Sequence, residues 1–213
     1  MNQSSADDIR AFIVERMPLA PVAGIPEIRL HQATSSSGLS HLATLYSDER
    51  TPFWAFAWAG GLALARHVLG NPTCVAGRRV LDLGAGSGLV AIAAAMAGAS
   101  AVSAADVDAL AMTAIQLNAA ANGVEIACIH GDLTDSSPPD ADLILAGDVF
   151  YDRAVAKRVL PYLRRCAEAG AHVLIGDPNR APLPRNRLRL IAHYNTGDVG
   201  ESALTQSYVY ALR

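Results

Sequence analysis

The sequence has few cysteines and no arrangement of side chains that typically holds a metal. Its three cysteines, Cys74, Cys128 and Cys166, are far apart and form no Cys-x-x-Cys pair, and its six histidines are scattered singly. Neither a disulfide framework nor a zinc site is therefore expected. We expect free thiols in a reducing compartment and no bound metal.

Long hydrophobic runs and an excess of charge are also missing. Residues 53–65 are apolar but too few to span a membrane, and the apolar run at residues 83–99 is broken by Gly and Ser. The formal net charge of -3 lacks the basic excess that nucleic-acid-binding proteins carry. The polar, acidic start MNQSSADDIR is unlike a secretory signal. These absences favour a cytoplasmic protein with no membrane and no nucleic-acid partner.

A chain of 213 residues is long enough for one domain with a sizeable core, and a monomer is the default expectation. From residue 76 onward, strand-like and helix-like patterns alternate. The expected strands are residues 78–84, 100–106, 125–130, 140–147, 171–176 and 207–212, and the expected helices are residues 87–97, 109–121, 154–169 and 185–193. Such alternation predicts an α/β fold with a mostly parallel sheet and helices on both faces.

The first 75 residues have a different pattern. Residues 7–15 and 55–69 have helical patterns, and residues 26–32 have a strand pattern. No obvious linker separates this part from the rest of the chain. We therefore expect residues 1–75 to form an N-terminal α/β extension that packs as a cap on a core of residues 76–213.

The stretch VLDLGAGSG, residues 80–88, has the pattern of a strand that runs into a glycine loop and then a helix. Gly84, Gly86 and Gly88 remove side chains where a ligand must approach the backbone, and a helix N-terminus offers free N–H groups. A dinucleotide fingerprint would be Gly-x-Gly-x-x-Gly, but here the last glycine comes one position early. The Gly-Lys-Ser/Thr end of a Walker-type phosphate loop is also missing. A nicotinamide-dependent oxidoreductase is therefore disfavoured.

Gly-x-Gly-x-Gly preceded by Asp82 resembles the first motif of the seven-strand (class I) S-adenosylmethionine-dependent methyltransferases, and the resemblance implies a Rossmann-like sheet of seven strands. Asp106 ends the second strand, 22 residues after Gly84, where a carboxylate can accept from both ribose hydroxyls. Asp132, in the stretch HGDL, comes after the third strand, where a carboxylate can accept from the adenine amino group. The alternative for both is a helix cap, which we expect for Asp108 at the start of the next helix.

Two tryptophans precede the glycine loop, in WAFAWAGGLALA at residues 54–65. Family members with a comparable Trp-x-Gly-Gly segment use the tryptophan to wall the cofactor. The resemblance implies this role for Trp58, beside Gly60 and Gly61, which leave room for close approach; Trp54 is expected in the core. The implied cofactor-binding residues are Trp58, Asp82, Gly84, Ala85, Gly86, Gly88, Asp106, Asp132, Leu133 and Gly147. S-adenosylmethionine is the implied donor and S-adenosylhomocysteine the product.

The stretch GDVFYD, residues 147–152, comes after the fourth strand, at the edge where ligands bind in open α/β sheets. An amide or adenine acceptor usually comes with Asn/Asp-Pro-Pro-Tyr/Phe at this point, and this chain has no proline here. Asp148-Val149-Phe150-Tyr151 instead resembles the D/E-x-x-Y/F signature of the seven-strand protein lysine methyltransferases. The acceptor implied by this resemblance is a lysine amine.

The resemblance extends over most of the chain, from about Ile9 to the C-terminus. The stretches that look like the bacterial relatives of the electron transfer flavoprotein β-subunit lysine methyltransferase are residues 52–69, 117–124, 147–152 and 175–188. This likeness implies methylation of lysines near the recognition loop of that flavoprotein subunit. The alternatives are lysine methylation of another basic protein, such as a ribosomal protein, and a non-catalytic protein that binds through the same fold.

A lysine acceptor must be neutral to attack the sulfonium carbon, although the pKa of a free lysine is about 10.4. Burial in a narrow apolar channel and the nearby sulfonium charge both lower that pKa. Asp148 can orient the amine by accepting its N–H, and Phe150 and Tyr151 can shape the channel. The alternative is that Asp148 caps the following helix and Tyr151 packs in its first turn.

The stretch DPNR, residues 177–180, comes after the fifth strand and could line the acceptor side, but a proline-containing turn is favoured. Four arginines lie at the end of this stretch and after it, namely Arg180, Arg185, Arg187 and Arg189. For these, a solvated helix face is favoured over contact with an acidic partner protein.

Overall fold

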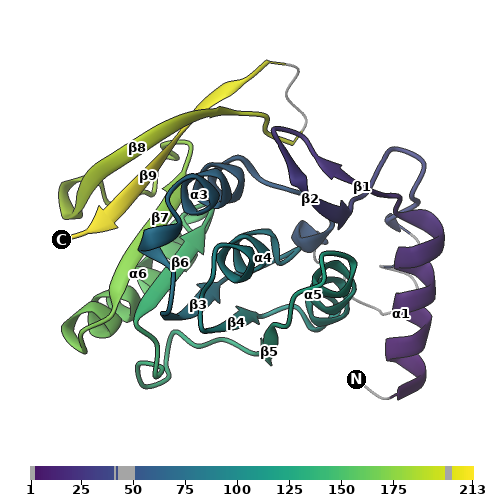
Figure 1. Cartoon of the computed structure of the whole chain (residues 1–213), viewed down its shortest axis with the longest axis horizontal. Helices are drawn as coiled ribbons and strands as arrows, with labels where there is room; N and C mark the ends of the chain where they lie inside the picture. The colour runs from purple at the N-terminus through teal and green to yellow at the C-terminus, as the bar shows by residue number, and fades with distance from the viewer. Residues whose placement is uncertain (1–2, 41, 43–50, 200–202) are drawn as a thin grey trace.

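The computed structural model describes residues 3–40, 42, 51–199 and 203–213. In these residues the chain forms a seven-stranded sheet and a two-stranded hairpin, with helices packed around the larger sheet (Figure 1). The hairpin strands are β1 (Leu19–Val22) and β2 (Ile25–His31). The strands of the larger sheet are β3 (Arg79–Leu83), β4 (Ala101–Asp106), β5 (Ala127–His130), β6 (Leu143–Gly147), β7 (His172–Asp177), β8 (Leu188–Thr196) and β9 (Thr205–Leu212).

The larger sheet has the strand order β5-β4-β3-β6-β7-β9-β8. The first five of these run parallel, whereas β9 runs antiparallel to both β7 and β8. The predicted α/β fold with a mostly parallel seven-stranded sheet is thus confirmed. The chain builds outward from β3 to β4 and β5, and then returns to β6 on the other side of β3. In open sheets the ligand crevice lies at such a switch point, outside the carboxyl ends of the strands.

The described α-helices are α1 (Gln3–Arg16), α3 (Ala59–Gly70), α4 (Leu89–Met96), α5 (Ala109–Ala121) and α6 (Arg153–Glu168). Helices α3, α4 and α5 cover one face of the larger sheet, and α6 covers the other. Both faces of the sheet are covered, and successive side chains of a strand point to opposite faces. Neighbouring residues of one strand therefore pack in different clusters. In β6, for example, Leu143 and Leu145 pack in the cluster of α3 and α4, whereas Ile144 and Ala146 pack in the cluster of α6.

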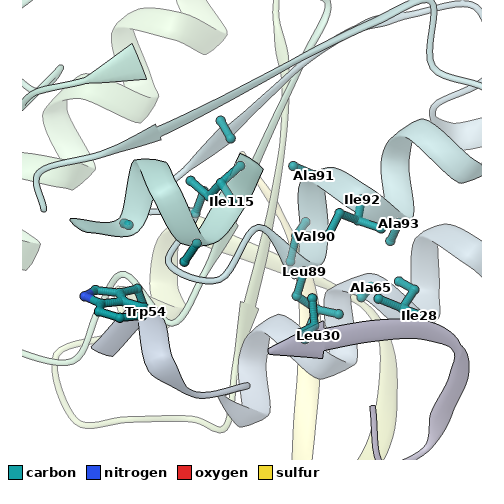
Figure 2. Packing of buried hydrophobic residues seen from close by; sticks show 14 of the residues in the cluster. Ile28, Leu30, Trp54, Ala65, Leu89, Val90, Ala91, Ile92, Ala93 and Ile115 are labelled. Atoms are coloured by element: carbon teal, nitrogen blue, oxygen red, sulfur yellow. The ribbon is translucent and has the colours of Figure 1, made fainter. Parts of the chain in front are cut away.

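Helix α4 lies at the centre of the larger buried cluster. Leu89, Val90 and Ile92 are buried, and so are Ala91, Ala93 and Ala94. Figure 2 shows Ile28 and Leu30 of β2 near this helix, and both belong to the same cluster. A helix that is apolar all round needs cover on every side, and α4 finds it in α3, β3, β4 and β2. The loop that precedes α4 is therefore held on a rigid support.

The N-terminal part is joined to α5 by two asparagine side chains. Asn122 accepts from the N–H of Arg29 at 2.9 Å and donates to its carbonyl at 2.6 Å. Asn118 accepts from the N–H of His31 at 2.8 Å. These amides pair backbone groups along the edge of β2, while α1 packs against α5 (Figure 1). Helix α3, which also precedes residue 75, packs directly on β7 and β9, and a domain boundary at residue 75 stays a prediction.

The structure corrects the prediction of a helix at residues 185–193. A one-turn 3-10 helix, Arg185–Arg187, leads directly into β8, which forms the edge of the sheet. Arginine and leucine favour helices, but pairing with β9 overrides that preference. A register shift between Leu190 and Ala192 also interrupts the alternation that would have indicated a strand. The helix predicted at residues 55–69 begins later, at Ala59, after a 3-10 turn at Phe53–Ala55.

Candidate active site

The glycine loop between β3 and α4 has a backbone conformation that other residues rarely adopt. Gly84, Gly86 and Gly88 have φ values of 69°, 52° and 82°. At Gly84 an added Cβ would come within 3.1 Å of a methyl carbon of Val149. Glycine is therefore favoured at these positions by conformation and by space, and the loop exposes bare backbone at the carboxyl end of β3.

A small pocket of about 40 Å³ lies against this loop. Six of the predicted cofactor-binding residues line it, namely Trp58, Asp82, Gly84, Ala85, Gly86 and Gly147. The other four, Gly88, Asp106, Asp132 and Leu133, are not among its lining residues. Sequence reasoning did not single out Phe56, Ala57 and Ser87, which also contribute to the wall. Because the pocket joins residues after β3 with the last residue of β6, it lies at the switch point of the sheet.

Asp82 lies in β3, just before the glycine loop, and its side chain is in the core. Its side chain is almost fully buried, and its Oδ2 atom accepts a hydrogen bond from the N–H of Ala91 in the first turn of α4 at 2.9 Å. Burial raises the pKa of this carboxyl to about 7, and the charge of Asp106 adds to the rise. Asp82 is thus an acid poised to titrate near neutral pH, at the wall of the pocket.

Asp106, at the end of β4, holds the glycine loop directly. Its Oδ2 atom accepts from the N–H of Gly86 at 2.8 Å, and its Oδ1 atom accepts from the N–H of Asp108 at 2.9 Å. Burial raises the pKa of Asp106, although these two hydrogen bonds act in the opposite direction. Asp108 accepts from the N–H of Leu110 and is the N-cap of α5, which confirms the cap predicted there.

Asp132 comes after β5, beside the end of β4. The adjoining residue, Gly131, donates its N–H to the carbonyl of Asp106 at 2.9 Å. The Asp132 carboxylate accepts from the N–H and hydroxyl of Thr134 and pairs with Arg158 at 2.7 Å. Burial by itself would raise the pKa of Asp132, but these partners lower it. The carboxylate is therefore kept ionised in a turn at the same edge of the sheet, rather than in a helix cap.

An aromatic group closes one side of the pocket. Trp58 donates its Nε1–H to the carbonyl of Phe53 at 2.9 Å, and its ring lies edge-on to the rings of Phe53 and Phe56. The ring of Tyr151 lies 5.6 Å from that of Phe53. Trp54 has only 1% of its surface exposed and packs in the core, as predicted. The aromatic group thus connects the cofactor-side pocket with the stretch after β6.

Asp148 caps a helix, but not the helix that comes next in the chain. Its Oδ1 and Oδ2 atoms accept from the N–H groups of Gly60 and Gly61, at 3.1 and 2.6 Å, in the first turn of α3. Helix α6 is capped instead by Asp152, so the alternative that Asp148 caps the following helix is wrong. Asp148 also has a φ of 57°, which is uncommon for a residue with a side chain. The structure thus places the carboxylate of a residue with left-handed backbone conformation directly beside the pocket residues Gly61 and Gly147.

Four glycines let α3 approach the ends of β6 and β7 closely. A Cβ at Gly60 would overlap the carbonyl group of Gly176, and a Cβ at Gly147 would come within 2.9 Å of the Cα of Gly61. The sequence suggested that Gly60 and Gly61 make room for a cofactor. At Gly60 that space is filled by the protein's own backbone and by Asp148, whereas Gly61 lines the pocket.

The side chain of Arg180 lies among three carboxylates. We call these three, Asp148, Asp177 and Asp198, the acidic cluster. The Nη1 atom of Arg180 donates to Asp148, and its Nη2 atom lies 3.4 Å from Oδ2 of Asp198. Its backbone N–H donates to Oδ1 of Asp177 at 2.7 Å. The prediction that Arg180 lies on a solvated helix face is wrong, since its side chain is only 21% exposed. No local sequence signal marked this arrangement, because its members come from three separate segments.

Comparison with known proteins now identifies the family. Residues 69–149 match the family model "Ribosomal protein L11 methyltransferase (PrmA)". The chain is 39% identical to the electron transfer flavoprotein beta subunit lysine methyltransferase of Danio rerio, over 91% of this chain and 78% of that protein. It is 37% identical to the protein of the same name from Xenopus laevis, over 99% of this chain and 89% of that protein. The chain belongs to the electron transfer flavoprotein beta subunit lysine methyltransferase family.

A solved structure supports the same assignment at the level of fold. The ribosomal protein L11 methylase from Lactobacillus delbrueckii subsp. bulgaricus is 26% identical, with a TM-score of 0.53, over 70% of this chain and 77% of that chain. This member of the lysine methyltransferase family is therefore an enzyme with S-adenosylmethionine as its methyl donor.

The residues that line the pocket of this methyltransferase suit such a cofactor. The pocket wall is bare backbone at Gly61, Gly84, Gly86 and Gly147, so a ligand can approach main-chain groups without meeting side chains. The buried carboxyl of Asp82 also lines the pocket, and its ionised form would attract a cationic ligand. When bound, S-adenosylmethionine supplies an electrophilic methyl group on a positively charged sulfur.

Phe150 and Tyr151 lie in different surroundings. Phe150 is 0% exposed and packs in the cluster of α6, and it is not among the residues that line the pocket; its role in shaping the channel stays a prediction. Tyr151 is 52% exposed and meets Phe53 at the rim of the site. Burial raises the pKa of Tyr151, with Asp106 and Asp152 adding to the rise, so its hydroxyl stays protonated.

A second cavity, of about 480 Å³, lies at the opposite edge of the sheet. Its wall includes Arg79, Asp142 and His172, at the amino ends of β3, β6 and β7. Arg79 pairs there with Asp142 at 2.8 Å, so these two charges neutralise each other. Ligands of open α/β sheets bind at the carboxyl ends, which favours the smaller pocket as the functional site. Among the described residues, no group of His, Cys, Asp or Glu side chains could hold a metal ion. His41 lies outside the described residues.

Proposed function

We propose that this enzyme transfers methyl groups from S-adenosylmethionine to lysine side chains of the β subunit of electron transfer flavoprotein. The proposal rests on the full-length likeness to relatives named for that activity. The observation that carries it within the site is the position of Asp148, which directly follows a pocket residue, Gly147, and adjoins another, Gly61. An acidic side chain at this place suits an amine acceptor.

The cofactor half of the proposal assigns roles to the residues around the glycine loop. Gly84, Ala85, Gly86, Gly88 and Gly147 would present backbone to the cofactor, with Trp58 as a side wall and Asp82 facing its charged end. Asp106 would accept from the ribose hydroxyls, and Asp132 with Leu133 would hold the adenine. The support is geometric: the loop, the end of β4 and the turn after β5 adjoin one another through the hydrogen bonds of Asp106.

The acceptor half assigns the amine to Asp148. From the described residues its Oδ1 atom has two donors, Gly60 and Arg180, while its Oδ2 atom has one, Gly61. A carboxylate oxygen can accept about two hydrogen bonds, so Oδ2 keeps one position for the lysine N–H. Tyr151 and Phe53 would form the rim of the channel, where an aromatic face attracts a methylated ammonium. The reaction needs in-line positioning more than a strong base.

We further propose that the enzyme works as a monomer in the cytoplasm and binds neither membranes nor nucleic acid. Its net charge of -3 supports the last point, because a phosphate-binding surface needs an excess of basic residues. In the part of the chain that the structure describes, no helix is long and apolar enough to cross a membrane.

A ribosomal protein is the second candidate acceptor. The family model that matches residues 69–149 is named for methylation of ribosomal protein L11. That match covers the glycine loop and stops at Val149, so it includes the cofactor side and little of the acceptor side.

The test is labelled-methyl transfer into a lysate of the source cell, followed by mass spectrometry of the labelled bands. We expect one dominant band, the flavoprotein β subunit, labelled on lysine. A labelled ribosomal protein with an unlabelled flavoprotein would select the second candidate. A matched reaction with an Asp106→Ala variant controls for other methyltransferases in the lysate.

A further inference from the structure

The acidic cluster holds more negative charge than Arg180 can pair. Three carboxylates surround one guanidinium, and they come from three segments: Asp148 after β6, Asp177 at the end of β7, and Asp198 between β8 and β9. All three carboxyl side chains are largely buried. Charges that are shielded from water interact strongly over several ångströms. The cluster therefore acts on any charged group that enters beside Asp148.

Within the described part of the chain, one carboxylate oxygen of the cluster has no hydrogen-bond partner. The Oδ2 atom of Asp177 is buried and unpartnered, and it lies 3.8 Å from Nη1 of Arg180. A buried acceptor without a donor is costly, and this one faces the guanidinium. The cluster thus has unused capacity to accept a donor or to stabilise a second cation. Burial raises the pKa of Asp177 to about 6.

Among the described residues, few hydrogen-bond donors and positive charges face these carboxylates. Helix α3 presents its first N–H groups: Ala59 donates to Asp198 at 3.3 Å, and Gly60 and Gly61 donate to Asp148. From β9, the hydroxyl of Tyr210 donates to Asn179, beside Arg180. Arg180 carries the full positive charge among these groups, and it reaches Asp148 with one nitrogen and Asp198 with the other.

An amine beside Asp148 therefore experiences two opposing effects. The three carboxylates favour its ammonium form, which binds well but cannot attack the methyl group. The guanidinium of Arg180 disfavours the ammonium form and so favours the reactive neutral amine. The balance between these effects sets the fraction of acceptor lysine that is ready to react.

We propose that Arg180 is a positioning residue of the acceptor site, which holds Asp148 and Asp198 together and offsets part of the cluster's negative charge, so that a larger fraction of the acceptor lysine is neutral. This inference rests on the proposed lysine methylation. Arginine suits the role because its planar fork bridges two carboxylates at once, which a lysine cannot reproduce. Arg180 itself takes no part in bond making; the amine nitrogen attacks the methyl carbon, and the leaving proton passes to water.

The experiment is the pH dependence of kcat and KM for methylation of the flavoprotein β subunit, measured from about pH 7 to about pH 10, above the pKa of Asp177. Arg180→Gln should raise the pH midpoint of kcat by about one unit. At pH values below that midpoint, kcat should fall about tenfold. KM should stay unchanged or become lower. Arg180→Lys keeps the charge and should keep the midpoint. All variants should bind S-adenosylhomocysteine as the wild type does.

A second variant tests the direction of the shift in the pH midpoint. It also gives an independent measurement if Arg180→Gln does not fold. Asp198→Asn removes one negative charge, but its amide oxygen can still accept from the N–H groups of Ala59 and Val199. We expect it to lower the pH midpoint, opposite to Arg180→Gln. Unshifted midpoints in the folded variants, or equal shifts in Arg180→Gln and Arg180→Lys, would overturn the role of Arg180. A wild-type enzyme that leaves the flavoprotein unmethylated would instead overturn the proposed function on which it rests.

Discussion

The Oδ2 atom of Asp106 accepts a hydrogen bond from the backbone N–H of Gly86 at 2.8 Å. This contact ties the carboxyl end of β4 to the glycine loop that comes after β3. It gives one carboxylate two roles, as a support for the loop and as a candidate acceptor for the ribose hydroxyls. The loop, the ribose position and the end of β4 are therefore expected to respond together when Asp106 is changed.

Replacing Asp106 should weaken cofactor binding. We expect Asp106→Asn to lower the affinity for S-adenosylhomocysteine by at least about tenfold, or about 1.4 kcal/mol, because an amide has one acceptor oxygen instead of two. Isothermal titration calorimetry measures this directly. The matched control is Asp108→Ser, which keeps a cap on α5 and should change the affinity by less than about twofold. Equal losses in both variants would assign Asp106 a purely structural role.

Replacing Asp148 should separate catalysis from cofactor binding. Asp148→Asn leaves one N–H of α3 without a partner, so we expect a stability loss of about 1 kcal/mol. Affinity for S-adenosylhomocysteine should stay within about threefold, while methyl transfer falls about a hundredfold, because the amine is no longer oriented. Asp152→Asn, at the cap of α6, should leave methyl transfer unchanged. If Asp148→Asn methylates as fast as the wild type, Asp148 is only a cap for α3.

The close approach of α3 to β7 should make Gly60 intolerant of any side chain. In Gly60→Ala the new methyl group would overlap the carbonyl of Gly176 and come within 2.9 Å of Cγ of Asp148. We expect a loss of about 2–3 kcal/mol in the free energy of unfolding, measured in urea. Gly70→Ala, at the other end of the same helix, has open space around it and should be neutral or stabilising by about 0.5 kcal/mol. Similar midpoints for the two variants would contradict this close packing of α3 on β7.

The buried carboxyl of Asp82 should make stability fall as pH rises. Its pKa is about 7 in the folded chain and about 4 in the unfolded chain, so between these values only the folded chain holds the proton. Raising the pH through this window therefore lowers the free energy of unfolding.

Asp82→Asn removes this proton and its effect. From about pH 4 to about pH 8, the stability of the variant relative to wild type should rise by about 4 kcal/mol. Urea unfolding of both proteins at several pH values gives the comparison. Parallel pH curves for the two proteins would show that Asp82 ionises in the folded chain as easily as in the unfolded one.

The glycine loop and its supports could be predicted from sequence because their signals are local. The glycine loop, Asp82 and the cap at Asp108 each lie within one strand–loop–helix unit, where spacing along the chain determines position in space. The two tryptophans could also be separated, since Trp58 adjoins a pair of glycines and Trp54 does not.

The acceptor side could not be predicted in the same way, because its contacts join distant segments. Arg180 pairs with Asp148, 32 residues before it, and with Asp198, 18 residues after it. Phe150 lies beyond the end of β6, where the two-residue alternation of a strand no longer tells which side chain is buried. The edge strand β8 has the sequence pattern of a helix, because its residues favour helices and a register shift interrupts its alternation.

The most direct test of the central claim is mass spectrometry of purified electron transfer flavoprotein after incubation with this enzyme and S-adenosylmethionine. We predict added methyl groups on lysine residues of the β subunit, absent when S-adenosylmethionine is omitted and strongly reduced with Asp148→Asn. An unmethylated β subunit, in the presence of folded enzyme that binds S-adenosylhomocysteine, would contradict the proposed function.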